Sequence, residues 1–403
     1  MSKRKTTITA LVLTALLLVT LLASCDSNNV SETSGTASTV SSSNSGSDTS
    51  KYVADIPNVN YNGDDFNVYT FYYERGAAGY TLFGSTGDSE LEENAVNTAI
   101  LERNYFVEEQ LGININELII ADVNRTANGD AYTTANNLML SGTETIHLLV
   151  PSLYSAAAYS QNGQLVDLLD LEYLHDLSAP WWDSYFVNDA QINGKLDFVT
   201  GDMTLYAKNG LFVNLFNKEL FARYELEDPY QLVRDNEWTL DKVSEMAHKM
   251  SSDQDNNGVI DYKDSYGFGG QDDTMTFWFY SFGGRIVSKN ADGGLELTLY
   301  SEKNVDYIEA IRSFMLDHTC YISANDYWNE PGYITTPTEL LYKAFMDNRS
   351  LFFNADLVFL KDIGDMKTDF GILPQPLYDE NQENYMQALN CWNTNPVCIP
   401  SYL

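Results

Sequence analysis

Residues 253–264, DQDNNGVIDYKD, place oxygen-bearing side chains at alternate positions along a short stretch of chain. A twelve-residue calcium loop takes its ligands from positions 1, 3, 5, 7, 9 and 12 and needs glycine at position 6 for the turn. Here Gly258 occupies the turn position, and the ligands would be Asp253, Asp255, Asn257, the Val259 carbonyl, Asp261 and Asp264. The pattern predicts a structural Ca²⁺ site of modest affinity, because position 12 is Asp rather than Glu. The alternative is a merely acidic surface turn.

A second chemically informative residue is Cys25, at the end of an apolar N-terminal stretch. Three basic residues at 3–5 precede a run, 7–22, that is almost wholly apolar or small, and the run ends in Leu-Ala-Ser-Cys. This is the pattern of a signal peptide over residues 1–24 with a cysteine to be acylated after cleavage. A transmembrane anchor is the alternative, but the apolar run is shorter than the roughly 20 residues that a spanning helix needs. The sequence therefore predicts lipidation at Cys25 and a place on the outer face of a cell membrane.

Residues 25–50 are almost entirely Ser, Thr, Asn, Gly and Asp and contain no aromatic residue. Such a segment buries too little apolar surface to offset its ordering entropy, so it is expected to be a disordered tether. The remaining chain, 51–403, is long enough for two domains.

The composition excludes several classes of function. The formal net charge is −34, which repels nucleic acid phosphates. No CxxC, HExxH, GxSxG or phosphate-binding glycine motif occurs, and the four histidines have no ligand spacing, so neither a zinc site nor an enzyme is expected. Besides Cys25 there are three cysteines, and an oxidising compartment would permit a bridge between Cys391 and Cys398.

Strand-like and helix-like segments alternate along the body, and its first part is predicted to be an α/β domain with a parallel sheet. Three helices are predicted: one over 91–111, a second that opens at Trp238 and a third around 305–315. The predicted strands are 66–73, 113–120, 146–151, 210–217, 351–354 and 370–374.

Several segments in this order resemble the extracellular sugar-type solute-binding proteins (family 1) of bacterial ABC importers. They are PWWD (180–183), NGKLDFVTGDMT (193–204), NLFNKELF (214–221), DPYQLVRDNEWTLDKV (228–243), DQDNNGVIDYKDSYGFGG (253–270), FGGRIV (282–287), AFMDNRSLFF (344–353) and DFGILPQP (369–376).

This resemblance implies a two-lobe periplasmic-binding-protein-like fold of type II, with a ligand cleft between the lobes. It places one lobe at about 60–165 and 335–372 and the other at about 166–334 and 373–403. It also implies a sugar or oligosaccharide as the solute and the permease subunits of an ABC transporter as the partner. In such relatives the chain continues after 403 into further helices, so the sequence is expected to be truncated at its C-terminus.

Aromatic platforms and Asp or Asn acceptors suit a sugar, which offers apolar C–H faces and many hydroxyls. The predicted ligand-binding residues are Trp181, Trp182, Asp202, Trp278, Asn354, Asp356 and Trp392. Asp183 and Trp328 are further possible contributors, whereas Trp238 is assigned to helix packing. For each tryptophan the alternative is a place in the core, where large rings are usually buried.

A carbohydrate-active or adhesive surface lipoprotein is the competing interpretation. Its discriminating observation is turnover of a glycan, or silence across a panel of sugars. A peptide or another solute also remains possible for a binding protein.

Overall fold

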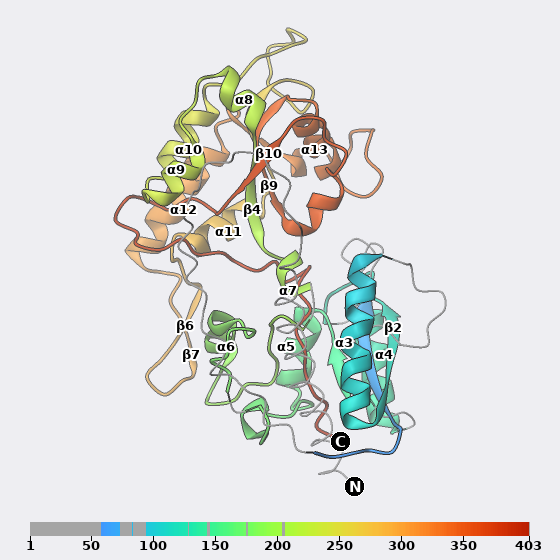
Figure 1. Ribbon diagram of the computed structural model, residues 1–403. Coiled ribbons are helices and arrows are strands. Elements are labelled where there is room, and N and C mark those ends of the chain that lie inside the picture. The colour runs from blue at the N-terminus through green and yellow to red at the C-terminus, as the bar shows by residue number, and fades with distance from the viewer. Residues whose placement is uncertain are drawn as a thin grey trace, which may run out of the picture. The chain divides into compact units, whose positions relative to one another are not determined.

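The computed structural model describes residues 58–72, 83, 94–127, 129–142, 146–174, 176–203 and 206–402 (Figure 1). The predicted signal peptide, the lipidation site Cys25 and the tether at 25–50 lie outside these residues. The chain divides into two units, one of Met1–Lys208 with Cys391–Leu403 and one of Asn209–Asn390. None of the helices in the described ranges has the length and apolar character that crossing a membrane would require.

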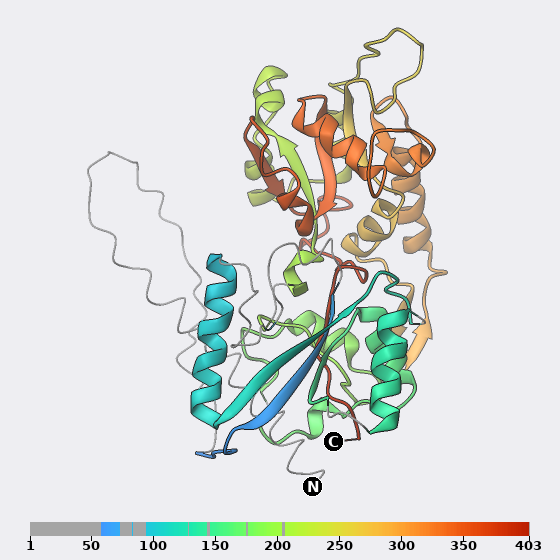
Figure 2. The same cartoon turned by 90° about the vertical axis from the view of Figure 1, so that its right-hand side faces the viewer.

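The first unit is built on a parallel three-stranded sheet in the order β2-β1-β3, and Figure 2 shows helices on both sides of it. Its elements are β1 (Asp64–Tyr72), α3 (Ala95–Leu111), β2 (Ile113–Ala121), α4 (Asp130–Ser141), β3 (Leu148–Val150), α5 (Leu153–Gln161), η2 (Leu168–Asp170), α6 (Ser184–Ala190) and α7 (Tyr206–Asn209), whose last residue opens the second unit.

The last residues of the chain return to this first unit. Isolated bridges pair Val397 with Val199, Cys398 with Leu149 and Pro400 with Leu165. The second unit is therefore an insertion between two parts of the first.

The second unit is built on a five-stranded mixed sheet in the order β10-β4-β9-β5-β8. Strands β9, β5 and β8 run parallel, and β4 runs antiparallel to both of its neighbours. Its elements are β4 (Phe212–Asn217), α8 (Lys218–Arg223), α9 (Pro229–Arg234), α10 (Leu240–Ala247), β5 (Tyr266–Gly270), α11 (Thr274–Ser281), β6 (Val287–Lys289), β7 (Leu295–Leu297), α12 (Glu302–Met315), β8 (Tyr321–Ser323), η3 (Ala324–Tyr327), α13 (Thr338–Met346), β9 (Ser350–Asp356), η4 (Leu357–Lys361) and β10 (Phe370–Leu373). The two ends of this unit meet, because Leu211 bridges to Leu389 and the Asn390 N–H donates to the Gly210 carbonyl at 2.7 Å.

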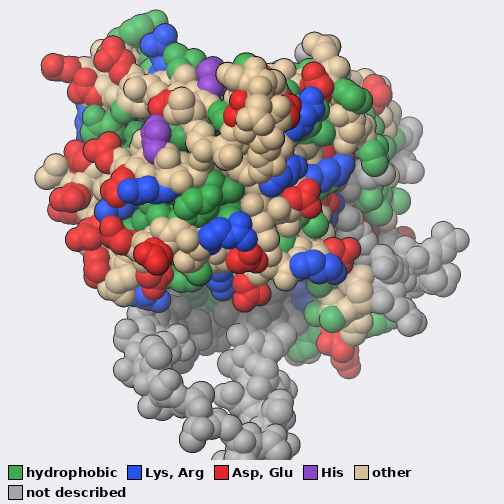
Figure 3. Space-filling view, turned by 90° about the horizontal axis from the view of Figure 1, so that it is seen from above, with side chains coloured by type: hydrophobic (Ala, Val, Ile, Leu, Met, Phe, Trp, Pro, Cys, Tyr) green, Lys and Arg blue, Asp and Glu red, His purple; other side chains and the backbone are tan. Residues whose placement is uncertain are grey.

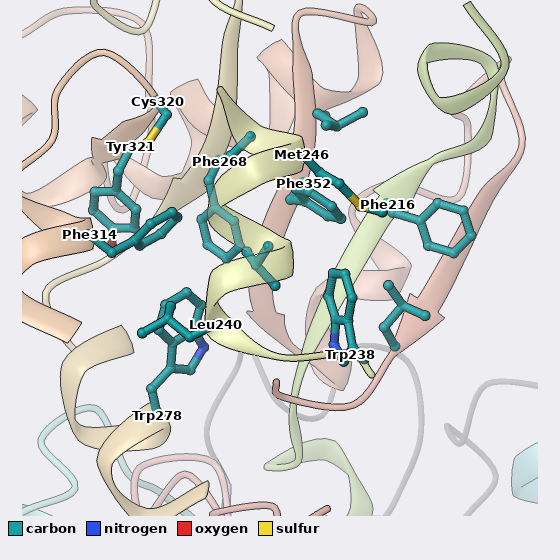
Figure 4. Close-up of a cluster of buried hydrophobic side chains, with 14 of the residues drawn as sticks. Phe216, Trp238, Leu240, Met246, Phe268, Trp278, Phe314, Cys320, Tyr321 and Phe352 are labelled. Atoms are coloured by element: carbon teal, nitrogen blue, oxygen red, sulfur yellow. The ribbon is translucent and has the colours of Figure 1, made fainter. Parts of the chain in front are cut away.

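Both faces of the five-stranded sheet are buried, since successive side chains of a strand point to opposite faces. On β9, Phe352 enters one apolar cluster and Phe353 enters another. In the first cluster, shown in Figure 4, Phe268 lies at the centre, with the rings of Phe314, Trp278 and Phe352 within 5.8 Å of its own. Large apolar rings cover both faces, so neither face of this sheet is open to a ligand.

Helix α10 shows how local sequence fixes an element of this unit. The Thr239 hydroxyl accepts the N–H of Lys242 as an N-cap, and the apolar residues of the helix share one buried face. At its other end, a Cβ added to Gly267 on β5 would lie 2.1 Å from the Ala247 carbonyl oxygen. Only glycine permits this close approach of helix and strand. Trp238, which precedes the helix, is fully buried, and its predicted packing role is confirmed.

The lobe boundaries predicted from the resemblance need correction. The segment 166–208 belongs to the first unit, because Trp182, Leu196 and Val199 are part of that unit's core. The segment 335–372 belongs to the second unit, where β9 lies between β4 and β5. The predicted elements were correct in type, but their pairing partners could not be read from their order.

Among the cysteines in the described ranges, Cys320 and Cys398 are free thiols. Cys398 is buried in the core of the first unit, whereas Cys391 is exposed.

Candidate functional site

The polar residues of the second unit gather where its parallel strands end. Strands β5, β8 and β9 end at Gly270, Ser323 and Asp356, and Phe212 at the start of antiparallel β4 pairs with Asp356. In open α/β sheets, ligands bind outside the carboxyl ends of the strands. This edge is therefore the candidate binding surface of the second unit.

A buried amide network supports this edge. The Oε1 atom of Gln375 accepts from Trp278 Nε1 at 2.6 Å, Asn354 Nδ2 at 3.1 Å and Asn214 Nδ2 at 3.3 Å. Asn354 Nδ2 also donates to Asn214 Oδ1 at 2.6 Å, and Asn354 Oδ1 accepts from Thr274 at 3.2 Å. All five side chains are fully buried, so the network fixes strand ends and the start of α11 in one arrangement.

The exposed polar side chains at this edge are also held in place by hydrogen bonds. Asp272 follows β5, and its Oδ1 accepts from the Ser323 hydroxyl at 2.8 Å while its N–H donates to Asn325 Oδ1 at 3.1 Å. Asp272 and Asn325 are both exposed. The edge thus presents a carboxylate and an amide in fixed positions, which can accept from and donate to hydroxyl groups.

The structure buries the three predicted ligand-binding residues of this unit and brings two of them together on Gln375. Trp278 and Asn354 are fully buried and share Gln375, and Asp356 is 1% exposed with its Oδ2 accepting from Asn390 at 3.0 Å. Figure 4 shows Trp278 within the apolar cluster that also contains Leu240. Asn354 and Asp356 both lie within β9. A direct contact of these residues with a ligand stays a prediction.

The predicted residues of the first unit fall into two groups. Trp181 and Trp182 are each 7% exposed and belong to the core. The Asp202 N–H donates to the Trp181 carbonyl at 2.8 Å, and its exposed carboxylate pairs with Lys208 Nζ at 2.9 Å. Trp392 is half-buried. Only Asp202 and Trp392 of this set therefore offer surface to a ligand in the structure described.

Two of the predicted tryptophans, Trp392 and Trp328, each pack against a tyrosine. Trp392 packs edge-on against Tyr154 at 6.3 Å between ring centroids. Trp328, in the second unit, is 54% exposed and packs edge-on against Tyr333. Asp183 is the N-cap of α6, because its carboxylate accepts the Phe186 N–H at 3.0 Å.

The first unit has a polar cluster at the carboxyl ends of its own parallel strands, which the sequence did not single out. Arg125 is fully buried, donates to Asn395 Oδ1 and lies 3.5 Å from Asp122, which directly follows β2. Asn395 Nδ2 donates to the carbonyls of Phe71 and Val150 at 3.2 and 3.1 Å, which ties the returning chain to β1 and β3. Burial raises the pKa of Asp122 to about 6, although the charge of Arg125 opposes this shift.

The predicted calcium loop brings three carboxylates together. Oxygens of Asp253, Asp255 and Asp264 all lie within 4.8 Å of one another. Asp253 accepts the N–H groups of Asn257 at 3.2 Å and Gly258 at 2.8 Å, and Gly258 has the positive φ of 87° that the turn position needs.

The other predicted ligands of the loop point elsewhere. Asp261 Oδ1 accepts the Lys263 N–H at 2.7 Å, and Asn257 Oδ1 accepts the Val259 N–H at 2.8 Å. The donor set is all oxygen, as Ca²⁺ prefers. Three carboxylates fit the ion as they stand, whereas Asn257 and Asp261 would have to turn inward.

No model of a protein family matches the chain, and no curated protein matches it by sequence. Solved structures do match. One is an ABC substrate-binding protein from Listeria monocytogenes in complex with cycloalternan, at 17% identity and a TM-score of 0.51 over 84% of this chain and 71% of that one. Another is a cyclo/maltodextrin-binding protein complexed with maltotetraose, at 12% identity and a TM-score of 0.54 over 85% of this chain and 71% of that one.

A third is the maltose-binding periplasmic protein of Listeria monocytogenes in complex with maltose, at 12% identity and a TM-score of 0.52 over 84% of this chain and 71% of that one. This chain has the periplasmic-binding-protein fold. The expected α/β, two-lobe architecture is thereby confirmed, and the two units of the chain are its two lobes.

Proposed function

We propose that this chain is an extracellular solute-binding lipoprotein that captures a carbohydrate and delivers it to the permease of an ABC transporter. The observation that carries the proposal is the fold, which it shares over more than four fifths of its length with proteins solved in complex with cycloalternan and maltotetraose. The absence of a catalytic motif in the sequence agrees with binding without turnover.

The strand ends of the second unit support a neutral, hydroxyl-rich solute. A sugar hydroxyl both donates and accepts, so it needs carboxylates and amides on rigid elements. Asp272 and Asn325 supply such groups at the exposed edge, and the network on Gln375 fixes the backbone beneath them. In the first unit, Asp202 and Trp392 supply an exposed carboxylate and part of an indole face.

The test is a panel of mono- and oligosaccharides, with free peptides and amino acids as comparison solutes, on the mature chain. A binding protein is expected to show a rise in Tm and a change in tryptophan fluorescence with one class of solute, and an unchanged solute on chromatography. Hydrolysis of a glycan would replace this proposal with an enzyme. A response to peptides alone would refute the sugar assignment.

The site itself is tested with a pair of matched variants. Asp272→Asn removes a charge at the exposed edge and is expected to weaken sugar binding about 10-fold, as befits loss of one charge-assisted hydrogen bond. Asp292→Asn, at another exposed aspartate in the turn between β6 and β7, is expected to leave affinity unchanged. Equal affinities for the two variants would show that the edge is not the binding surface.

We also propose the lipid anchor on Cys25 as the means that keeps the protein near its permease on the outer face of the membrane. The support is the sequence pattern around this cysteine. Mass spectrometry of the exported protein is expected to find an N-terminal acylated cysteine. A chain that is cleaved elsewhere or carries a free Cys25 thiol would contradict the anchor.

A structural Ca²⁺ at residues 253–264 is the third part of the proposal. It is supported by the convergence of Asp253, Asp255 and Asp264 and by the all-oxygen donor set. Calorimetric titration of chelator-treated protein is expected to detect one Ca²⁺ with a dissociation constant no weaker than millimolar. Absence of binding at that concentration would remove the site.

A further inference from the structure

A second group of metal-ligating side chains lies away from the strand ends and from the acidic loop. His248 ends helix α10, and Asp317 and Cys320 lie in the turn between α12 and β8. One ligand atom from each lies within 4.8 Å of the other two. Because His248 and Asp317 are 69 residues apart, no local spacing in the sequence marks them as a site.

The imidazole of His248 is oriented as a ligand would be. Its Nδ1 lies 2.6 Å from the Ser244 backbone carbonyl, which can only accept, so Nδ1 carries a proton. The remaining nitrogen, Nε2, therefore points at Asp317, with 2.9 Å between Nε2 and Oδ2. Histidines that bind metals in proteins almost always donate their other ring N–H to such a carbonyl or carboxylate.

The carboxylate of Asp317 is fixed in the same way. Its Oδ1 accepts from the Thr319 N–H at 3.0 Å and from the Thr319 hydroxyl at 2.5 Å. The second oxygen, Oδ2, is thus held toward His248.

Cys320 is the third residue of the group and is its buried member. Its N–H donates to the Asp317 carbonyl at 3.0 Å, a turn that brings the thiol back toward the carboxylate. The side chain is fully buried, and Figure 4 shows it next to Tyr321 at one side of the apolar cluster. The side chains of His248 and Asp317 are 42% and 37% exposed, so an ion can enter from solvent. Figure 3 shows histidine side chains at the surface on the face of the molecule seen from above.

We propose that His248, Asp317 and Cys320 form a zinc site with three protein ligands and a fourth position open to water. Thiolate, imidazole and carboxylate together favour Zn²⁺ over Ca²⁺ or Mg²⁺, which take oxygen ligands. Zinc bonds of about 2.0–2.3 Å place tetrahedral ligand atoms roughly 3.3–3.7 Å apart. The Nε2–Oδ2 pair would have to open by a few tenths of an ångström, and pairs at the 4.8 Å limit would close by about 1 Å.

The ion would displace two protons to solvent: the one in the hydrogen bond between His248 Nε2 and Asp317 Oδ2, and the one on the Cys320 thiol, which binds metal as the thiolate. It would join the end of α10 to the turn before β8, two segments that pack on the same apolar cluster. A cross-link between segments distant in sequence stabilises the folded unit by the free energy of binding that the unfolded chain lacks. Zinc binding at this site is therefore expected to stabilise the second unit.

The test uses the mature chain, freed of metal, with Ca²⁺ in excess to occupy the acidic loop. Calorimetry with Zn²⁺ is expected to give one site per chain, and Co²⁺ is expected to give the charge-transfer absorption of a cobalt–thiolate bond. His248→Gln is expected to weaken Zn²⁺ binding at least 100-fold, whereas His318→Gln, an exposed change two residues from Cys320, leaves it unchanged. Thr319→Val, which removes only a positioning hydroxyl, is expected to weaken binding about 10-fold.

The cobalt spectrum of the unmodified protein reports Cys320 directly, so the result does not depend on whether a variant of this buried residue folds. No charge-transfer band, or Zn²⁺ binding that His248→Gln and His318→Gln weaken equally, overturns the proposal. Zinc binding that vanishes in excess Ca²⁺ would place the ion in the loop at 253–264 and likewise overturn it.

Discussion

Replacing Gln375 by Met tests whether the buried amide network supports the strand ends of the second unit. Met has a similar length and no acceptor, so the change removes the one oxygen on which Trp278, Asn354 and Asn214 converge. Asn354 keeps the Val213 carbonyl and Asn214 Oδ1 as acceptors, and Asn214 keeps the Pro374 carbonyl. The indole N–H of Trp278 alone loses its acceptor.

The expected loss of stability follows from which donors keep an acceptor and which do not. An orphaned buried donor costs about 1–3 kcal/mol, and each longer bond that has a replacement costs about 0.5 kcal/mol. Gln375 Nε2 is buried and meets no acceptor among the described residues. Replacing it by an apolar group removes this unsatisfied donor and offsets part of the lost stability. We expect the free energy of unfolding of the second unit to fall by about 2 kcal/mol, which lowers its Tm by about 4–8 °C.

Thermal unfolding followed by tryptophan fluorescence measures this fall, and a double-mutant cycle assigns it. Trp278→Phe removes the indole N–H, so it is expected to cost about 1–2 kcal/mol less in the Gln375→Met background than in the natural chain. Gln231→Met, on the exposed face of α9, is the matched control and is expected to change stability by less than about 0.5 kcal/mol.

Two outcomes would refute the reasoning. One is a Gln375→Met variant as stable as the Gln231→Met control. The other is a cycle in which Trp278→Phe costs the same in both backgrounds, since the indole N–H would then not depend on Gln375.

Three further changes test other parts of the molecule. The folded-state pKa of Asp122, about 6, lies above its unfolded value, so its contribution to stability is full below about pH 4 and is lost as pH rises to about 6. Asp122→Asn should remove this decline of about 3 kcal/mol from the stability–pH curve, and an unchanged slope would contradict the buried titration. Gly267→Ala places a methyl group against the end of α10 and should lower the free energy of unfolding, measured with urea, by about 3 kcal/mol or more. Gly269→Ala, where the nearest atom to the new methyl group is a side-chain atom at 3.3 Å, should lower it clearly less. Equal losses of stability in the two variants would rule out the steric cause. A calcium chelator should lower the Tm of the natural chain by a few degrees but not that of Asp264→Asn, and a drop in both would place the ion elsewhere.

Local patterns in the sequence were sufficient for the elements and for part of the acidic loop. The apolar spacing after Trp238 predicted α10, and the spacing of Asp253, Asp255 and Asp264 predicted that their carboxylates converge. These features depend on residues that are close along the chain. The segments quoted for the resemblance also predicted the fold, which the similar solved structures confirm.

Features that depend on distant residues could not be predicted in this way. Nothing in the local sequence distinguishes Gln375 or Asn214, because their role arises when β10 pairs with β4. The group of His248 with Cys320 has the same origin, since its members come from α10 and from the turn after α12. The burial of Trp278 and Asn354 likewise follows from packing, so residue type alone could not decide between core and ligand contact.

The insertion of the second unit into the first has a consequence for the order of folding. Pairing Leu149 with Cys398 closes a loop of roughly 250 residues, but a folded second unit, whose ends meet at Leu211 and Leu389, shortens it to roughly 70. The entropic cost of that closure then falls by about 1 kcal/mol. Residues 391–403 complete the first unit and are synthesised last, so the first unit cannot be completed before the inserted unit has been made. Folding of the inserted unit first would therefore make completion of the first unit less costly in entropy.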